Sequence, residues 1–103
     1  MINKAKVITV CGSLRFQAEF IAESERLELD GNCVLSVIYP TKEKDAYTTA
    51  EIEVLGKMHF QKIAMSDAIY VVNVDGYIGE STRNEIEYAR KMGKEILSLE
   101  PLD

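Results

Sequence analysis

The sequence predicts an α/β fold: a three-layer α/β/α arrangement in which helices cover both faces of a doubly wound parallel sheet of four to five strands. Two observations predict it. The strand-like segments are continuous apolar runs rich in β-branched residues, which is typical of strands buried on both faces. Helix-like segments alternate with them along the whole chain, as helical crossovers do between parallel strands. With 103 residues, the chain is expected to form one domain, residues 1–103.

The first third of the chain is predicted to contain a strand and a helix. The run KVITVC at residues 6–11 is β-branched and stops at Gly12, which indicates a strand. Residues 15–29 are predicted to form a helix. The Asp-Gly-Asn sequence at residues 30–32 ends it, because these residues favour turns.

The middle of the chain is predicted to contain the second strand and the longest helix. Residues 33–39 form an apolar run that Pro40 ends, since proline has no amide hydrogen for a sheet ladder. Residues 41–47 are a polar loop, and residues 49–66 are predicted to form the long helix.

The last third is predicted to contain two strands around one helix. The run AIYVVNV at residues 68–74 is the third strand, and residues 81–92 form a helix that Gly93 ends. Residues 95–99 form a short fourth strand, and a fifth is not obvious. A small sheet of this kind resembles flavodoxin-like and Rossmann-like doubly wound folds.

Charge and hydropathy exclude several classes of partner. The formal net charge is −5 and the sequence has no basic stretch, which argues against a nucleic-acid polymer as the ligand. No apolar run approaches the roughly 20 residues of a membrane-spanning helix. The first six residues lead directly into the first strand without the pattern of a signal peptide, so we expect a cytoplasmic protein.

The cysteines and the histidine give no sequence signal for a metal. Cys11 and Cys33 fall in separate predicted strands, and a disulfide between them is not expected in a reducing cytosol. His59 is the single histidine, and no cysteine lies near it at metal-ligand spacing. We therefore expect neither a metal site nor a cofactor.

The long middle helix has two apolar arcs where a surface helix needs one. Ile52, Leu55, His59 and Ile63 make the first arc, and Val54, Met58 and Met65 make the second. The second arc predicts a homodimer or a higher homo-oligomer, although a broad contact with the core explains it equally well.

Two loops follow the strands that flank the expected switch point of the sheet. If the strand order begins 2-1-3, the switch point lies between strands one and three, where folds of this kind bind ligands. Residues 12–15 follow the first strand and residues 75–80 follow the third. We therefore expect these two loops to face each other across a ligand-binding crevice.

The first loop has the residues of a phosphate site. Gly12 permits close approach of backbone and ligand. Ser13 and the nearby helix amides can donate hydrogen bonds to phosphate oxygens, and Arg15 can add a bidentate charged pair. The alternative is structural: Ser13 caps the helix and Arg15 is a solvated residue of its first turn.

The second loop leads into the helix that carries the most informative carboxylate. Gly79, Ser81 and Thr82 offer a further ligand-binding helix start, and Glu85 lies at the edge of that helix's apolar stripe. A capping box with Thr82 as the cap and Glu85 as its acid explains the glutamate without any catalysis. Both alternatives remain open at this point.

Three segments resemble one known superfamily. The motifs CGSLRF, MHFQKIAMSDAIYVVNV and GESTRNEIEYARKMGKEI, in this order, are similar to the nucleoside 2-deoxyribosyltransferase-like superfamily. Within it, the resemblance is strongest to 2′-deoxynucleoside 5′-phosphate N-hydrolases and to short uncharacterised bacterial relatives. It covers nearly the whole chain.

The resemblance implies an enzyme that acts on a nucleoside or nucleotide. In that family, the glutamate that corresponds to Glu85 attacks the anomeric carbon of deoxyribose, and water or a second base completes hydrolysis or transfer. By the same correspondence, Ser13 and Arg15 hold the 5′-phosphate. Ser81 or Thr82 contributes from the facing loop.

The chain differs from the family pattern at two positions. The family has an aspartate one helical turn after the histidine that matches His59, where this chain has Lys62, and a tyrosine in the first strand, where it has Thr9. His59 and Lys62 are therefore further candidates for the site, although a lone histidine in an apolar arc is more often a packed residue. The alternative function is a non-catalytic nucleotide-binding module of the same fold.

Overall fold

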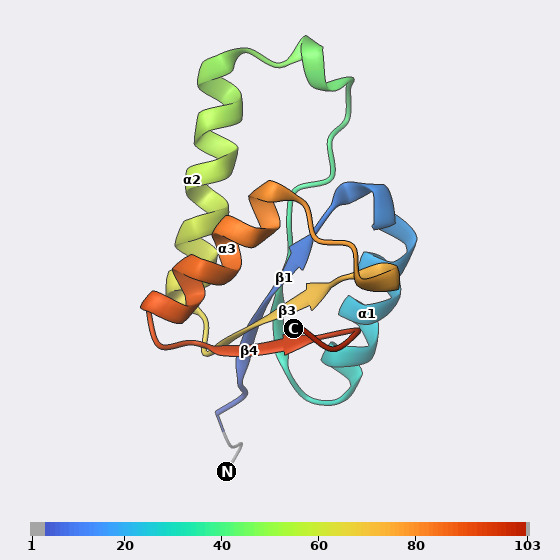
Figure 1. Cartoon of the computed structure of the whole chain (residues 1–103), viewed down its shortest axis with the longest axis vertical. Coiled ribbons are helices and arrows are strands. Elements are labelled where there is room, and N and C mark those ends of the chain that lie inside the picture. The colour runs from blue at the N-terminus through green and yellow to red at the C-terminus, as the bar shows by residue number, and fades with distance from the viewer. Residues whose placement is uncertain (1–3, 103) are drawn as a thin grey trace.

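The computed structural model describes residues 4–102; residues 1–3 and 103, at the ends of the expected domain, lie outside the described residues. Four strands form one parallel sheet in the order β2-β1-β3-β4 (Figure 1). The elements are β1 (Val7–Gly12), η1 (Leu14–Phe16), α1 (Gln17–Leu29), β2 (Cys33–Leu35), η2 (Lys44–Ala46), α2 (Thr49–Met65), β3 (Ala68–Val72), η3 (Val74–Gly76), α3 (Glu80–Lys91) and β4 (Glu95–Ser98). The predicted α/β fold is confirmed.

The sheet separates two apolar cores because successive strand residues point to opposite faces. On one face the strands pack against α1, and on the other against α2 and α3, as the layers in Figure 1 show. The α1 core contains Ile8, Val10, Phe20, Leu27, Ala68, Tyr70 and Val72. The opposite core contains Cys11, Ile63, Ile69, Val71, Ile86 and Ala89.

The second strand is shorter than the sequence predicts. It ends at Leu35, whereas its apolar run continues to residue 39. The side chains of Val37 and Tyr39 pack against the α1 core. These two residues are therefore partly buried although their backbone is not paired in the sheet. The carbonyl of Ser36 accepts a hydrogen bond from Lys62 Nζ at 2.6 Å, which ties the end of β2 to α2.

The long helix α2 projects beyond the carboxyl ends of the strands (Figure 1). A capping box fixes its start: the amide of Glu51 donates to Thr48 Oγ1 at 3.1 Å, and the amide of Thr48 donates to Glu51 Oε1 at 2.8 Å. The projecting half gives the molecule its longest dimension, 46 Å against 30 and 27 Å. None of the helices within residues 4–102 is long and apolar enough to cross a membrane.

A buried phenol joins α1 to the central strand β3. The hydroxyl of Tyr70 donates to Glu23 Oε1 at 2.6 Å, and Arg26 pairs with the same oxygen at 3.0 Å. Burial, and then the Glu23 carboxylate, raise the pKa of Tyr70 to about 12. Burial disfavours the charged form of Glu23, but the hydrogen bonds from Tyr70 and Arg26 outweigh it and lower the pKa of that carboxyl.

This contact predicts a loss of stability at high pH. A free tyrosine has a pKa of about 10, so the folded state holds the Tyr70 proton more tightly than the unfolded state. The resulting stabilisation is complete below about pH 10 and is lost as the pH rises from about 10 to about 12. Urea unfolding of the wild type should therefore show a larger decrease in unfolding free energy between about pH 8 and about pH 11 than unfolding of Tyr70→Phe. Tyr39→Phe is the control, and equal decreases in all three proteins contradict the assignment.

Candidate functional site

The loops after β1 and β3 meet at one edge of the sheet. The two strands are paired in parallel, with Gly12 opposite Val72, so both loops leave from the same end. The guanidinium of Arg15 lies over the ring of Tyr77, 4.1 Å from its centroid, and Phe16 meets the same ring edge-on at 5.9 Å. The expectation that residues 12–15 and 75–80 face each other is confirmed.

Gly12 is required by the packing of the two strands. Its φ of +147° lies outside the range that L side chains usually adopt. A Cβ at this position would lie 2.9 Å from the carbonyl oxygen of Val72 and 3.1 Å from the ring of Phe20. Gly12 thus allows a close approach of β1, β3 and α1, whereas the sequence predicted an approach of backbone and ligand.

Ser13 and Arg15 have the structural roles that the sequence analysis gave as the alternative to phosphate binding: a helix cap and an exposed first-turn residue. Ser13 is the N-cap of η1, and its Oγ accepts a hydrogen bond from the amide of Arg15 at 3.3 Å. Arg15 is exposed, and its stacking on Tyr77 uses the face of the guanidinium. The N–H edge of a stacked guanidinium still points outward and can bind an anion.

The alternative of a capping box formed by Thr82 and Glu85 at the start of α3 is wrong. The helix begins at Glu80, and its N-cap is Gly79, which has no side chain to bond the first amides. Thr82 is inside the helix and buried, and Glu85 lies in the second turn, beyond reach of the cap position. The extended backbone of Gly79 (φ −79°, ψ 173°) brings the chain into helical geometry earlier than the Ser-Thr pair suggests.

Glu85 faces His59 across the two helices that cover the second core. His59 Nε2 lies 3.3 Å from Glu85 Oε1, and the two side chains are 11% and 15% exposed. The Sγ atom of Cys11, at the end of β1, completes a group of three donor atoms that all lie within 4.8 Å of one another. Sequence spacing indicated no such cluster, because the three residues come from β1, α2 and α3.

The cluster contains polar atoms without partners. Neither ring nitrogen of His59 nor Oε1 of Glu85 makes a hydrogen bond to any of residues 4–102, since the pair at 3.3 Å lacks the necessary alignment. Burial, and then the Glu85 carboxylate, raise the pKa of the Cys11 thiol well above its ordinary value. A buried carboxylate oxygen without a hydrogen-bond donor is costly, so this cluster differs from the satisfied polar groups of the core.

The two positions that differ from the family pattern have structural roles. Lys62 donates to Ser36, so its ammonium is held at the β2 edge of the sheet. Thr9 is fully buried, and its Oγ1 lies 2.5 Å from Ser66 Oγ, which in turn donates to the carbonyl of Lys62 at 2.7 Å. These contacts join β1 to the end of α2.

Sequence reasoning missed two residues of this region. Cys11 was expected to form neither a disulfide nor a metal site, although its neighbour Val10 faces α1 and strand alternation therefore places Cys11 on the α2 and α3 face. Tyr77, which contacts both Arg15 and Phe16, is not among the site residues that the sequence predicts. Its position between two glycines in a ligand-facing loop was the available signal.

Comparison with solved structures identifies the fold. A 2-deoxyribosyltransferase from Bacillus psychrosaccharolyticus superposes with a TM-score of 0.72 at 14% identity, covering 94% of this chain and 77% of the other. A 2-deoxyribosyltransferase from Leishmania mexicana gives 0.66 at 18% identity, covering 90% of this chain and 63% of the other. A conserved protein from Enterococcus faecalis gives 0.65 at 16% identity, covering 92% and 63%.

The chain thus has a nucleoside 2-deoxyribosyltransferase-like fold, as the sequence motifs predicted. It spans less than two thirds of the length of the second and third of these proteins. No protein-family model matches the chain, and no curated protein matches its sequence.

The packing at Gly12 predicts a large effect of one added methyl group. Gly12→Ala meets both an unfavourable φ and a carbonyl oxygen at 2.9 Å, so we expect a loss of about 2–4 kcal/mol in the free energy of unfolding. Gly31→Ala is the matched control, because Gly31 also has a positive φ (+96°) but nothing within 4 Å of the added carbon. Its expected cost is about 1 kcal/mol. Urea unfolding measures both, and equal losses contradict the close contact.

Proposed function

We propose that this protein breaks the N-glycosidic bond of a deoxynucleoside or a deoxynucleoside 5′-monophosphate, with Glu85 as the nucleophile. The observation that carries the proposal is the buried Glu85 Oε1, which has no hydrogen-bond partner among residues 4–102 and lies 3.3 Å from His59 Nε2, in a fold shared with 2-deoxyribosyltransferases. Such a carboxylate is available to act on a bound ligand, because no residue among 4–102 donates a hydrogen bond to its buried Oε1.

The proposed reaction has two displacements at the sugar. Glu85 attacks the anomeric carbon, the bond from that carbon to the base breaks, and a glycosyl-enzyme ester forms. The departing base takes up a proton, for which His59, 3.3 Å from Glu85, is the candidate donor. Water then attacks the same carbon and releases the sugar and the carboxylate, whereas a second base in place of water gives transfer.

The substrate phosphate, where present, is proposed to bind between the two loops. Ser13 and Arg15 approach from one side, and the uncapped amides of α3 with Gly79 and Ser81 from the other. A helix start without a side-chain cap attracts anions, because its amides and its dipole are both free. Thr82 is buried one turn before Glu85, on the helix face that packs on the sheet, so we assign it to the floor of the site.

A binding module without turnover is the second candidate. It is favoured by Thr9 and Lys62, which replace the tyrosine and aspartate of the family pattern and are both engaged in structural hydrogen bonds. In that case nucleotide binding persists without release of base. We propose a cytoplasmic location for either function, in keeping with an exposed free thiol at Cys33.

The first test separates turnover from binding. We expect purified wild-type protein to release free base from one or more deoxynucleosides or their 5′-monophosphates, followed by proton NMR. Glu85→Gln should reduce the rate about 10³-fold or more, because the amide cannot form the glycosyl ester. Glu87→Gln on the exposed face of the same helix should have little effect.

The outcomes discriminate between the proposals. Release of base by Glu85→Gln at the wild-type rate rules out the nucleophile. Ligand-induced shifts without release in the wild type favour the binding module.

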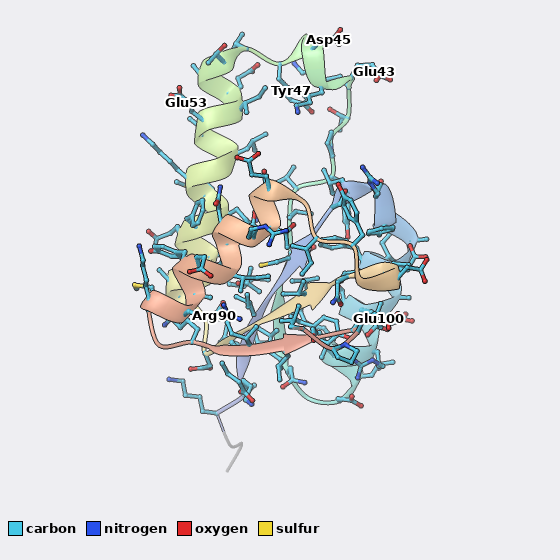
Figure 2. All side chains as sticks on the ribbon, viewed as in Figure 1. Glu43, Asp45, Tyr47, Glu53, Arg90 and Glu100 are labelled. Carbon is cyan, nitrogen blue, oxygen red and sulfur yellow. The ribbon has the colours of Figure 1, made fainter. Side chains whose placement is uncertain are left out.

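Exposed apolar residues along α2 support the proposal of a homodimer. The second apolar arc is uncovered in the monomer: Val54, Met58 and Met65 are 51–63% exposed. Beside it lies an apolar hollow of about 350 Å³, lined by Tyr47, Ala50, Glu51, Val54 and Leu55. Figure 2 shows Tyr47 between η2 and α2. Exposed apolar side chains grouped on a helix in this way are typical of an oligomer contact.

A charge in this arc should dissociate the dimer. We expect the wild type to sediment as a dimer and Met58→Asp to shift it toward monomer, because an aspartate in an apolar interface is buried without a partner. Leu29→Asp is the matched control, since Leu29 is 81% exposed and lies at the end of α1. A wild type that is monomeric at all concentrations contradicts the assignment, as does equal dissociation by both variants.

A further inference from the structure

Three side chains with metal-ligand chemistry converge from three elements of the fold. Cys11 is the penultimate residue of the central strand β1, His59 lies in α2, and Glu85 lies in α3. One donor atom of each lies within 4.8 Å of the other two. The strand and both helices pack in the same core, so the positions of the three residues are fixed by the fold and do not depend on a loop.

The donor atoms are not used by the rest of the described chain. His59 Nδ1, His59 Nε2 and Glu85 Oε1 are buried without hydrogen bonds among residues 4–102. Cys11 is fully buried, and among residues 4–102 its Sγ donates one long hydrogen bond, of 3.9 Å, to the carbonyl of Thr9, while the Glu85 carboxylate lies beside the thiol. A single cation placed among them would satisfy a thiolate, an imidazole and a carboxylate together.

We propose that Cys11, His59 and Glu85 form a binding site for a divalent transition-metal ion of the zinc type. Thiolate and imidazole ligands select zinc or its neighbours over magnesium and calcium, which prefer all-oxygen sites. On binding, the metal forms bonds to Cys11 Sγ, to one nitrogen of His59 and to a carboxylate oxygen of Glu85. The thiol proton leaves to solvent.

The geometry fits three of the four ligands of a tetrahedral ion. Zinc bonds of about 2.0–2.3 Å separate neighbouring donor atoms by about 3.5 Å. The observed donors reach this separation with side-chain shifts of about 1 Å. Three protein ligands leave the fourth position open to water or another small ligand. Because neither nitrogen of His59 has a partner among residues 4–102, the site lacks the outer hydrogen bond that usually strengthens a histidine ligand, and we expect weaker binding than in structural zinc sites.

Metal binding and glycosidic chemistry exclude each other at Glu85. A carboxylate oxygen that is bonded to a metal cannot attack a sugar carbon, so zinc should inhibit base release. This consequence rests on the proposed function, whereas the metal site does not. Direct measurement of metal binding therefore tests the site even if the protein turns over no nucleotide.

The experiment uses the full-length, metal-free protein titrated with Co²⁺ and with Zn²⁺. We expect a near-ultraviolet charge-transfer band that reports a cobalt–thiolate bond, displaced by zinc, and one zinc per chain by calorimetry. Cys11→Ser should abolish the band, and Glu85→Gln should lower the zinc affinity at least about tenfold. Cys33→Ser is the matched control because it removes the exposed thiol of β2 and leaves the cluster intact.

Two outcomes overturn the proposal. One is the absence of cobalt and zinc binding by the wild type in both measurements. The other is a cobalt band that survives Cys11→Ser and is lost in Cys33→Ser. Circular dichroism checks that Cys11→Ser folds, and Glu85→Gln, at a less buried position, supplies an independent test if it does not.

Discussion

The parallel pairing of β1 with β3 is the constraint on which the rest of the structure depends. It places the ends of both strands at one edge, so the loops that carry Arg15 and Tyr77 meet there. It also fixes strand alternation, which sends Val10 to the α1 core and Cys11 to the core under α2 and α3. The pairing persists to the end of both strands because residue 12 is a glycine and allows the Val72 carbonyl to approach. A side chain there would separate the strands at the point where the crevice begins.

Buried polar groups elsewhere in the described chain show how the fold treats such groups when they are structural. Asn73 is 1% exposed, and its amide both donates to the Glu100 carbonyl at 3.1 Å and accepts from the Glu100 amide at 2.8 Å. Figure 2 marks Glu100 beside the C-terminal end of the chain. The other buried atoms left without partners belong to Ser24 and Ser36, whose neutral hydroxyls cost less than a carboxylate. Glu85 and His59 therefore differ from the structural polar groups, and a ligand is the simplest physical reason.

Features that depend on local pattern could be predicted from the sequence. The strand and helix order, the facing loops and the position of Glu85 at the edge of an apolar stripe follow from periodicity and topology. Features that depend on competition between contacts could not. Residues 36–39 have the composition of a strand, yet Val37 and Tyr39 pack against the α1 core while the backbone leaves the sheet. The Ser-Thr pair resembles a helix cap, but the backbone of Gly79 starts the helix first. The proximity of Cys11, His59 and Glu85 has no spacing signal, because it arises from three separate elements.

The early start of α3 has a consequence for chemistry. If Thr82 were the cap, the Glu85 carboxylate would bond the amide at the helix start and would stabilise the helix instead of being free for a ligand. With Gly79 as the cap, the amides and the carboxylate are separate: the helix start is open to an anion, and the acid lies in the second turn beside His59. In the proposed function, the same helix holds a substrate phosphate at its start and presents Glu85 from its second turn, as a nucleophile or as a metal ligand. Glycosyl attack and metal coordination require the same free lone pairs on Glu85, so the feature that permits one also permits the other. What occupies the space beside Cys11 and His59 decides between them.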